Sequence, residues 1–512
     1  MKNLLLTILA TFVLLTQTSI GQIKHADFTV KGFHLDLRVQ VMKMPALKKF
    51  AKQLKDGGMN TLIMEWEATY PYKNHPLIPN QYAYTRAEVI DFVNYCEKLG
   101  IDVIPLQQSF GHVEYILRHY RYKELREDQK DFSQINPLKE DLARALFKDL
   151  FSDLINTHKS DYIHIGGDET YLLGHSKESQ KKVAELGKGR LYGDYIKLLC
   201  ELVVELGKKP VVWADIAMKY PDALKGLPKE TVFVDWNYGW DINMFGKHSN
   251  LLESGFEIWG APSLRSHPDN FYITQWEKHF RNIREFIPLA RGFGYKGMVI
   301  TSWSTSGLYS SLWESPRDLV ELYPVRRVYP LSGFNILIAA YFEASNSKKP
   351  LNVDDFVLSY AKKQYGFSNE ESKRFWKALQ GNPYEINQGV VGSSDLKIEA
   401  VKDSADWVLS EFNTLKPKLN QDEFAHYPLM AEIRVQYLSY MLIEQKLNQP
   451  EFQESQLVEI IAELKKLKDN DLNERFTALN KDFIYLREIE DENELRNRKI
   501  NLLYERLTRI KQ

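Results

Sequence analysis

Cysteine is the residue this sequence most lacks. Only Cys96 and Cys200 occur among 512 residues, and they lie far apart in the chain. Structural zinc sites take their cysteines from closely spaced pairs, which these two do not form, so a cysteine-based metal centre is essentially excluded. An exported protein could join the two in a disulfide, but we expect both to be buried free thiols.

An excess of charge of one sign is also absent. The sequence has 67 Lys and Arg against 68 Asp and Glu, a formal net charge of −1, and no long block of one sign. This balance argues against nucleic acid or an anionic membrane as the main partner. Long apolar runs are missing after the first 21 residues, so we expect no membrane span in the rest of the chain.

The first 21 residues have the pattern of a signal peptide. Lys2 gives a positive start, Leu4 to Leu15 form an apolar stretch too short to cross a bilayer comfortably, and Ser19-Ile20-Gly21 fits the small-x-small cleavage rule. The alternative is an uncleaved membrane anchor. We expect cleavage near Gly21 and an exported protein, periplasmic or secreted.

A short apolar strand followed by an amphipathic helix recurs through residues 22–330. The eight expected strands are Gly32–Arg38, Thr61–Trp66, Asp102–Gln108, Asp161–Gly166, Pro210–Trp213, Thr231–Trp236, Phe256–Trp259 and Gly297–Trp303. The expected helices between them include Ala46–Gly57, Thr85–Leu99, Leu138–Thr157 and Ser176–Leu206. Eight such units predict an α/β fold, a (β/α)8 TIM barrel. A doubly wound sheet is the alternative, but Leu35-Asp36-Leu37-Arg38 stands where its glycine fingerprint would be.

The pattern becomes purely helical after residue 330. Apolar residues such as Val401, Ala405 and Val408 recur at helical spacing, and the tail from Glu488 to Gln512 reads as a last amphipathic helix. We therefore predict a C-terminal all-α helical region over residues 331–512. Such a tail is compatible with a homodimer.

Polar and aromatic residues gather at the ends of the expected strands, where barrel enzymes carry their chemistry. The most informative run is His164-Ile165-Gly166-Gly167-Asp168-Glu169. Adjacent carboxylates at a strand end suit a reaction that needs one ionised and one protonated acid. The competing interpretation is an acidic helix N-cap.

These residues resemble glycoside hydrolase family 20, the β-N-acetylhexosaminidases, and most closely its hexosaminidase D branch. The matching runs are Phe33-His34-Leu35-Asp36-Leu37, Leu62 to Glu67, Tyr70-Pro71-Tyr72, Tyr82-Ala83-Tyr84, Val103 to Gln107, Phe110-Gly111-His112, and His164 to Glu169 with Tyr171-Leu172-Leu173-Gly174. The likeness is dense to about residue 174 and sparser to about residue 314.

The resemblance implies an exo-acting, retaining enzyme in which the 2-acetamido group of the substrate attacks its own anomeric carbon. Asp168 would hold the acetamido N–H, and Glu169 would be the general acid and base, its pKa raised by Asp168 and nearby rings. Tyr238 would donate to the acetamido oxygen. His112, backed by Glu65 or Glu67, would orient Glu169. His164 is expected to fix the loop.

The resemblance also implies a set of sugar-binding residues. Arg38 would bind hydroxyls, although it follows Asp36 by two residues where the usual family spacing is three and the hexosaminidase D branch has Lys. The remaining expected contacts are Trp213, Asp215, Trp236, Trp259, Trp303 and Glu314. No cofactor and no metal are implied.

Two other interpretations stay open at this stage. His34, Asp36, His112, His164 and Asp168 could converge on zinc in a metal-dependent barrel hydrolase, although no His-x-His pair ends the first strand. The chain could also be a non-catalytic protein that binds N-acetylhexosamines. The hexosaminidase and the sugar-binding interpretations both predict a carbohydrate, an N-acetylhexosaminide, as the partner.

Overall fold

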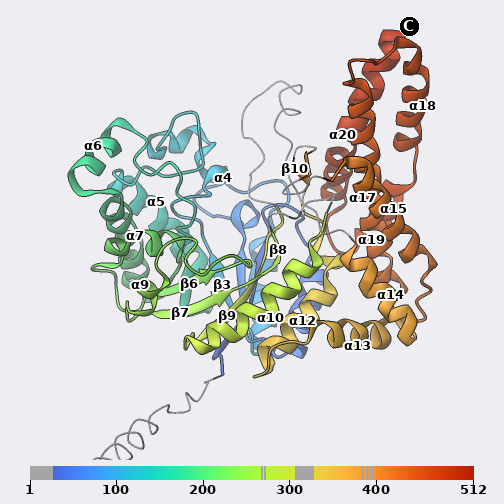
Figure 1. The fold of residues 1–512 in the computed structure, drawn as a ribbon. Helices are drawn as coiled ribbons and strands as arrows, with labels where there is room; N and C mark the ends of the chain where they lie inside the picture. The colour runs from blue at the N-terminus through green and yellow to red at the C-terminus, as the bar shows by residue number, and fades with distance from the viewer. Residues whose placement is uncertain are drawn as a thin grey trace, which may run out of the picture.

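Eight parallel strands close into a barrel in the computed structural model, which describes residues 27–511 except 267–268, 270–272, 306–327, 382–385, 388–389 and 392–395. The barrel strands are β1 (Val30–Asp36), β2 (Thr61–Glu65), β3 (Asp102–Leu106), β4 (Tyr162–His164), β5 (Lys209–Trp213), β6 (Val232–Trp236), β7 (Glu257–Ala261) and β9 (Gly297–Ser302). Closure comes from β1 pairing with both β2 and β9, in register from Val30 opposite Gly297. The short β8 (Ser263–Arg265) extends β7 beyond Pro262 and also pairs with β9. The TIM barrel predicted from the sequence is confirmed (Figure 1).

Side chains alternate between the barrel interior and the helix layer along each strand. Ile63, Ile104 and Val211 belong to a separate apolar cluster inside the barrel, whereas Leu35 and Leu62 belong to the large core shared with the helices. The same alternation turns the polar residues of β1 inward. The alternation of side chains along the strands therefore gives the barrel an apolar interior and a polar layer at the carboxyl ends of the strands.

Helices surround the strands as the pattern predicted (Figure 1). Those that follow the first four strands are α2 (Met44–Asp56), α3 (Arg86–Lys98), α5 (Glu140–Ile155) and α7 (Lys188–Glu205), and later ones are α8 (Asp215–Lys219), α9 (His248–Leu252), α10 (Trp276–Gly292) and α12 (Asn335–Asn346). A capping box between Thr85 and Glu88 starts α3. The predicted helix Ser176–Leu206 is two helices, α6 (Lys177–Leu186) and α7, because Gly187 lies at φ 83° between them.

The C-terminal region is helical, as expected. Its helices are α13 (Val353–Tyr365), α14 (Asn369–Gln380), α15 (Ile398–Thr414), α16 (Gln421–Phe424), α17 (His426–Leu447), α18 (Leu457–Lys468), α19 (Leu472–Asn480) and α20 (Leu486–Lys511). This region contacts the loop after β1: the N–H of Lys43 donates to the carbonyl of Phe483 at 2.9 Å, and Met42 forms a bridge with Ile484. On the barrel side, the Tyr341 hydroxyl of α12 reaches the carbonyls of Gly32 and Met298 at 2.8 and 2.7 Å. The division at residue 331 stays a prediction.

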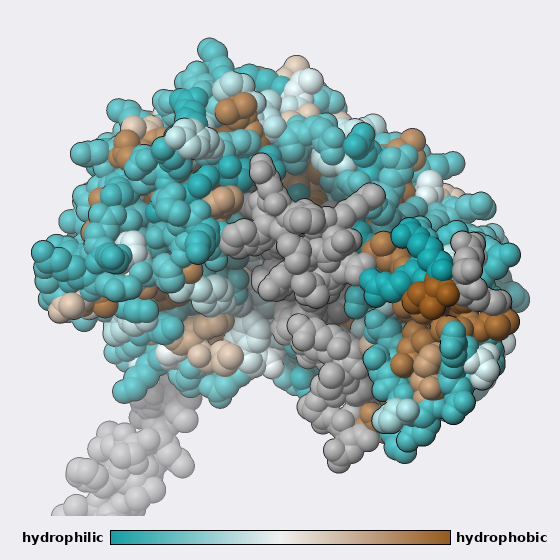
Figure 2. All heavy atoms as spheres, turned by 90° about the horizontal axis from the view of Figure 1, so that it is seen from above, coloured by the Kyte–Doolittle hydropathy of each residue, from teal (hydrophilic) through white to brown (hydrophobic). Residues whose placement is uncertain are grey.

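The face of the molecule seen in Figure 2 is mainly hydrophilic, and its broadest apolar area lies over the C-terminal helices. Val458 of α18 and Ile510 of α20 are among the exposed hydrophobic side chains. No helix in the described ranges is long and apolar enough to cross a membrane. Cys96 and Cys200 are buried free thiols, as expected, and burial raises the pKa of each to about 12.

Candidate active site

The loop after β4 turns sharply at three residues with positive φ. Gly166 lies at 73°, Gly167 at 94° and Glu169 at 46°. A Cβ on Gly166 would stand 2.0 Å from Oε1 of Gln108, and the positive φ would strain any other residue there. His164 fixes this loop, as predicted, because its Nδ1 accepts the N–H of Gly166 at 3.1 Å and burial lowers the pKa of the imidazole to about 3. The turn separates the side chains of Asp168 and Glu169.

His112 joins the two carboxylates. Its Nε2 lies 3.4 Å from Oδ2 of Asp168 and 3.3 Å from Oε2 of Glu169. His112 follows β3 at φ 55°, and the preceding Gly111 passes so close to the β4 loop that a Cβ there would stand 2.7 Å from the Asp168 carbonyl oxygen. The geometry therefore brings together three residues that the sequence placed at two different strand ends.

The protonation of this group differs from the sequence-based expectation. Burial acts to lower the pKa of His112, but Asp168 and Glu169 outweigh it and raise that pKa well above its usual value. Burial likewise acts to raise the pKa of Glu169, but hydrogen bonding and charge from His112 outweigh it, so the pKa of Glu169 lies below its ordinary value. The expected rise was wrong for the ligand-free site, because the sequence could not show an imidazolium beside Glu169.

Asp168 and Glu169 face different surroundings. The Asp168 side chain is 7% exposed, and its Oδ1 is buried with no hydrogen-bond partner among the described residues. The Glu169 side chain is 27% exposed, and its Oε1 accepts the Tyr171 hydroxyl at 2.8 Å. Asp168 is thus enclosed and has one oxygen without a donor among the described residues, whereas Glu169 is partly exposed to solvent.

Asp215 and Trp236 lie beside this pair. Asp215 accepts the backbone N–H of Glu169 on Oδ2 and the indole N–H of Trp236 on Oδ1, both at 3.2 Å. Burial and the neighbouring charge of Asp168 raise the pKa of Asp215 to about 8. Asp215 therefore supports the β4 loop from α8.

Tyr238 and three aromatic or imidazole rings line the next side of the barrel mouth. The indole N–H of Trp303 donates to the Tyr238 hydroxyl at 2.7 Å. Trp303 also lies 4.6 Å from the His34 ring and 6.0 Å from the Trp213 ring, centroid to centroid. The predicted residues Tyr238, Trp213 and Trp303 thus belong to one aromatic wall.

Arg38 lies over an acidic layer at the ends of β1 and β2. Its Nη2 contacts Oε1 of Glu65 and its Nε contacts Oε1 of Glu67, both at 3.2 Å. Asp36 accepts the N–H of Arg38 at 2.7 Å and the backbone N–H of Ser304 at 2.9 Å. Glu65 also accepts from His34 and Gln108. Whether Glu65 or Glu67 backs His112 stays a prediction.

One predicted residue, Trp259, does not join the described site. Trp259 was expected at a strand end, but β7 continues to Ala261, and the Trp259 ring lies fully buried in the interior beside Tyr162, the first residue of β4. Its indole N–H donates to Glu257, the first residue of β7, at 2.8 Å. Because β7 continues for two residues after Trp259, this ring lies one side-chain layer below the carboxyl end of the barrel. It therefore fills the amino-terminal end of the interior. Glu314 lies outside the described residues.

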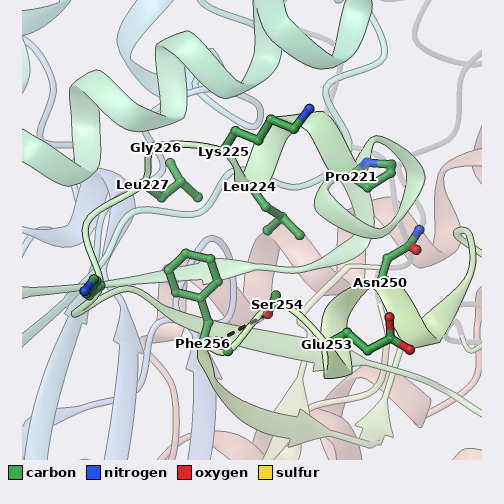
Figure 3. A pocket seen from close by; sticks show the side chains of 11 residues that line it. Pro221, Leu224, Lys225, Gly226, Leu227, Asn250, Glu253, Ser254 and Phe256 are labelled. Carbon is green, nitrogen blue, oxygen red and sulfur yellow. Dashed lines mark hydrogen bonds between the residues drawn. The ribbon is translucent and has the colours of Figure 1, made fainter.

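A surface hollow lies at the opposite end of the barrel (Figure 3). It is formed by segments that precede β6 and β7, and its lining is Pro221, Leu224, Lys225, Gly226, Leu227, Lys229, Asn250, Glu253, Ser254, Gly255 and Phe256. None of the predicted site residues lines it. We therefore assign the chemistry to the carboxyl ends of the strands.

Sequence reasoning missed two residues of the site. Tyr171 was noted only as part of the family resemblance, and its hydroxyl bonds Glu169. Glu114 is buried two residues after His112, and burial raises its pKa to about 7. An acid two residues from a predicted catalytic His was the available signal for Glu114.

The metal-dependent interpretation finds no support in the described part of the chain. No group of three or more His, Cys, Asp or Glu is arranged to hold a metal ion there. His34 is instead bonded to Glu65, and His164 to the backbone of its own loop.

The chain was compared with known families, sequences and structures. The model of the glycosyl hydrolase family 20 catalytic domain matches residues 34–310. Hexosaminidase D of Bos taurus is 27% identical over 298 residues, covering 55% of this chain and 86% of the relative. Hexosaminidase D of Homo sapiens is 27% identical over 305 residues, covering 56% and 62%.

Among solved structures, the β-N-acetylhexosaminidase from Bacteroides fragilis aligns with a TM-score of 0.49 and 19% identity over 66% of this chain and 70% of that chain. The match of the family model spans more than half of the sequence and includes the strand ends from β1 to β9. The chain belongs to glycosyl hydrolase family 20 and is a glycoside hydrolase.

Proposed function

We propose that this protein is an exo-acting, retaining β-N-acetylhexosaminidase that releases terminal N-acetylglucosamine or N-acetylgalactosamine through an oxazolinium intermediate. The names of its relatives, hexosaminidase D among them, support this substrate class. The observation that carries the proposal is the open acceptor on Asp168. Oδ2 of Asp168 faces His112, whereas the buried Oδ1 has no partner among the residues described.

Asp168 receives the acetamido N–H of the substrate. A buried carboxylate oxygen without a donor is costly, and the amide N–H of the substrate is a neutral donor that satisfies it. As the acetamido oxygen bonds to the anomeric carbon, positive charge develops on the amide, and Asp168 stabilises that charge. Intramolecular attack of this kind reaches effective molarities of about 10⁵–10⁸ M when the groups are aligned.

Glu169 gives a proton to the leaving oxygen as the bond to the anomeric carbon breaks. In the free site this proton resides on His112, whose Nε2 lies 3.3 Å from Oε2 of Glu169. A bound sugar that excludes water and hydrogen-bonds to Asp168 destabilises the charged imidazolium of His112. This favours transfer of the proton from His112 to Glu169. Glu169 then takes a proton from the water that attacks the anomeric carbon and opens the intermediate. Return of that proton from Glu169 to His112 as the product leaves restores the starting state.

Tyr238 directs the acetamido oxygen toward the anomeric carbon. Its hydroxyl accepts the indole N–H of Trp303 and also contacts the Thr301 side chain. Because an indole can only donate, Trp303 does not use the hydroxyl proton of Tyr238, which can turn to the acetamido oxygen. Trp213 and Trp303 stand beside it and enclose the acetamido methyl. This wall excludes water, which strengthens the charge interactions of Asp168 and Glu169.

Arg38 binds hydroxyls of the sugar in the terminal subsite. Its side chain is 8% exposed and is held by Glu65 and Glu67, so the guanidinium is positioned before substrate arrives. Trp236 and Asp215 line the adjacent side. We also propose, from the sequence of the first 21 residues, that the protein is exported after cleavage of a signal peptide.

Hydrolysis of nitrophenyl β-N-acetylglucosaminide and β-N-acetylgalactosaminide tests the proposal. We expect turnover of at least one substrate and strong competitive inhibition by a thiazoline mimic of the cyclised intermediate, because the mimic presents its ring nitrogen to Asp168 and a sulfur in place of the acetamido oxygen to Tyr238. The variant Asp168→Asn should lose turnover and inhibitor affinity together, whereas Asp222→Asn, in the surface segment before β6, should lose neither. Turnover insensitive to the thiazoline would contradict the substrate-assisted route.

A further inference from the structure

Tyr171 combines two properties that are rarely found in one side chain. The residue is 81% exposed, yet its hydroxyl donates to Oε1 of Glu169 at 2.8 Å. Most exposed tyrosines direct their hydroxyl to solvent. Here the hydroxyl is committed to the carboxyl group that acts on the leaving oxygen, and the ring face is left open.

The backbone around Tyr171 is firmly anchored. The N–H of Tyr171 donates to the carbonyl of Glu169 at 2.8 Å, and the next N–H, that of Leu172, donates to Gln134 at 2.9 Å. Further along the loop, the buried Glu127 accepts the N–H groups of His175 and Ser176 at 2.8 and 2.9 Å. The exposed ring is therefore held in place before any ligand binds, which lowers the entropy cost of using it as a contact.

The position of the ring follows from the chemistry of Glu169. A general acid must come within about 2.6–3.2 Å of the oxygen that it protonates. Since the Tyr171 hydroxyl lies 2.8 Å from the same carboxyl group, the leaving group must pass beside the Tyr171 ring. An amphipathic ring with an open apolar face is suited to the C–H face of a pyranose.

We propose that Tyr171 forms the aglycone subsite, where its ring stacks on the sugar that carries the leaving oxygen and its hydroxyl positions Glu169. This inference rests on the proposed function and names the substrate class within it: oligosaccharides whose leaving group is itself a pyranose. Tyr171 is a positioning and specificity residue, because it acts on the aglycone and on Glu169 but not on the bond that breaks.

Two substrates with equally poor leaving groups separate these roles. N,N′-diacetylchitobiose leaves a sugar alkoxide, and methyl β-N-acetylglucosaminide leaves methoxide with no ring to stack. We expect Tyr171→Ala to lower kcat/KM for the disaccharide about tenfold more than for the methyl glycoside, the scale of one aromatic contact. Tyr171→Phe keeps the ring and should retain the preference for the disaccharide.

The pH profile of Tyr171→Phe reports the second role. A hydrogen bond to a carboxylate favours its charged form, so loss of the hydroxyl should raise the pKa of Glu169 and draw the shared proton from His112 toward it. The alkaline limb of kcat/KM reports loss of that shared proton from the free enzyme and should therefore move to higher pH. Both variants should unfold at the temperature of the wild type, because the side chain is exposed. If Tyr171→Ala lowers both substrates alike, or Tyr171→Phe leaves the profile unmoved, the inference is wrong. A wild-type enzyme that cleaves neither substrate would instead refute the proposed function.

Discussion

The imidazole of His34 donates from Nε2 to Oε2 of Glu65 at 2.8 Å, and both side chains are fully buried. Burial acts to raise the pKa of Glu65, but the bonds and charges of His34 and Arg38 outweigh it and hold that pKa well below its usual range. Oε1 of Glu65 also accepts from Arg38 and Gln108, so one carboxylate connects β1, β2 and the loop after β3. The ends of three neighbouring strands are therefore held by a single charge.

Replacing that charge should destabilise the fold as well as the sugar site. Glu65→Gln places amide protons where His34, Arg38 or Gln108 now donate, and breaking a buried ion pair costs about 3–5 kcal/mol. We expect a fall of that order in the free energy of unfolding, measured by urea denaturation. As a control, Asp56→Asn breaks the exposed ion pair with Lys52 and should produce no measurable change. Equal stability of Glu65→Gln and wild type would contradict this account of the Glu65 interactions.

The acid role of Glu169 predicts a loss that depends on the leaving group. Glu169→Gln cannot supply a proton, so hydrolysis of alkyl and sugar glycosides should fall by about 10²–10⁴-fold. Activated aryl glycosides need less protonation and should retain more activity. Steady-state kcat on a series of leaving groups of graded acidity measures the difference, and a uniform loss across the series would remove Glu169 from the acid role.

The barrel and the location of its site could be predicted because both depend on local patterns. Period-two strands and amphipathic helices give the barrel, and Asp168, Glu169 and His112 lie at strand ends in the sequence itself. The depth of a side chain within a strand is less local. Trp259 was misplaced because β7 extends two residues further than its apolar run suggested.

Interactions between distant segments could not be predicted. The pKa of Glu169 depends on an imidazole 57 positions earlier in the chain, since His112 and Glu169 meet only after β3 and β4 pair. Contacts between distant loops at the carboxyl end of the barrel are similar: the buried Arg265 donates to Gln40 and to the carbonyl of Tyr329, both at 2.8 Å. No spacing rule within one segment encodes such contacts.

Asp215 makes stability depend on pH in a direction that can be checked. Its pKa is raised from 3.8 to about 8, so the folded state holds a proton that the unfolded state releases near pH 4. Stability from this group therefore falls as pH rises from about 4 to 8, by up to about 1.4 kcal/mol for each pH unit in that range. Asp215→Asn imitates the neutral acid and should gain melting temperature relative to wild type as pH rises through this range. A constant difference between pH 4.5 and 8.5 would show that Asp215 is ionised in the folded protein throughout.

The contact between Gly111 and Asp168 offers a steric test of the site that adds no charge. A methyl group at position 111 would stand 2.7 Å from the Asp168 carbonyl oxygen, and backbone on both sides leaves little room to relax. Gly111→Ala should therefore push the β4 loop away from His112. A displacement of about 1 Å at a catalytic group can cost about 10²-fold in rate, so kcat should fall by that order.

Gly292, the last residue of α10, is the matched control, because a Cβ there meets nothing within 4 Å. Gly292→Ala should leave kcat unchanged and raise stability slightly, by up to about 1 kcal/mol from helix propensity. If Gly111→Ala kept full activity, the β3 and β4 loops would have to lie further apart than this geometry places them, and His112 could not share its proton with Glu169.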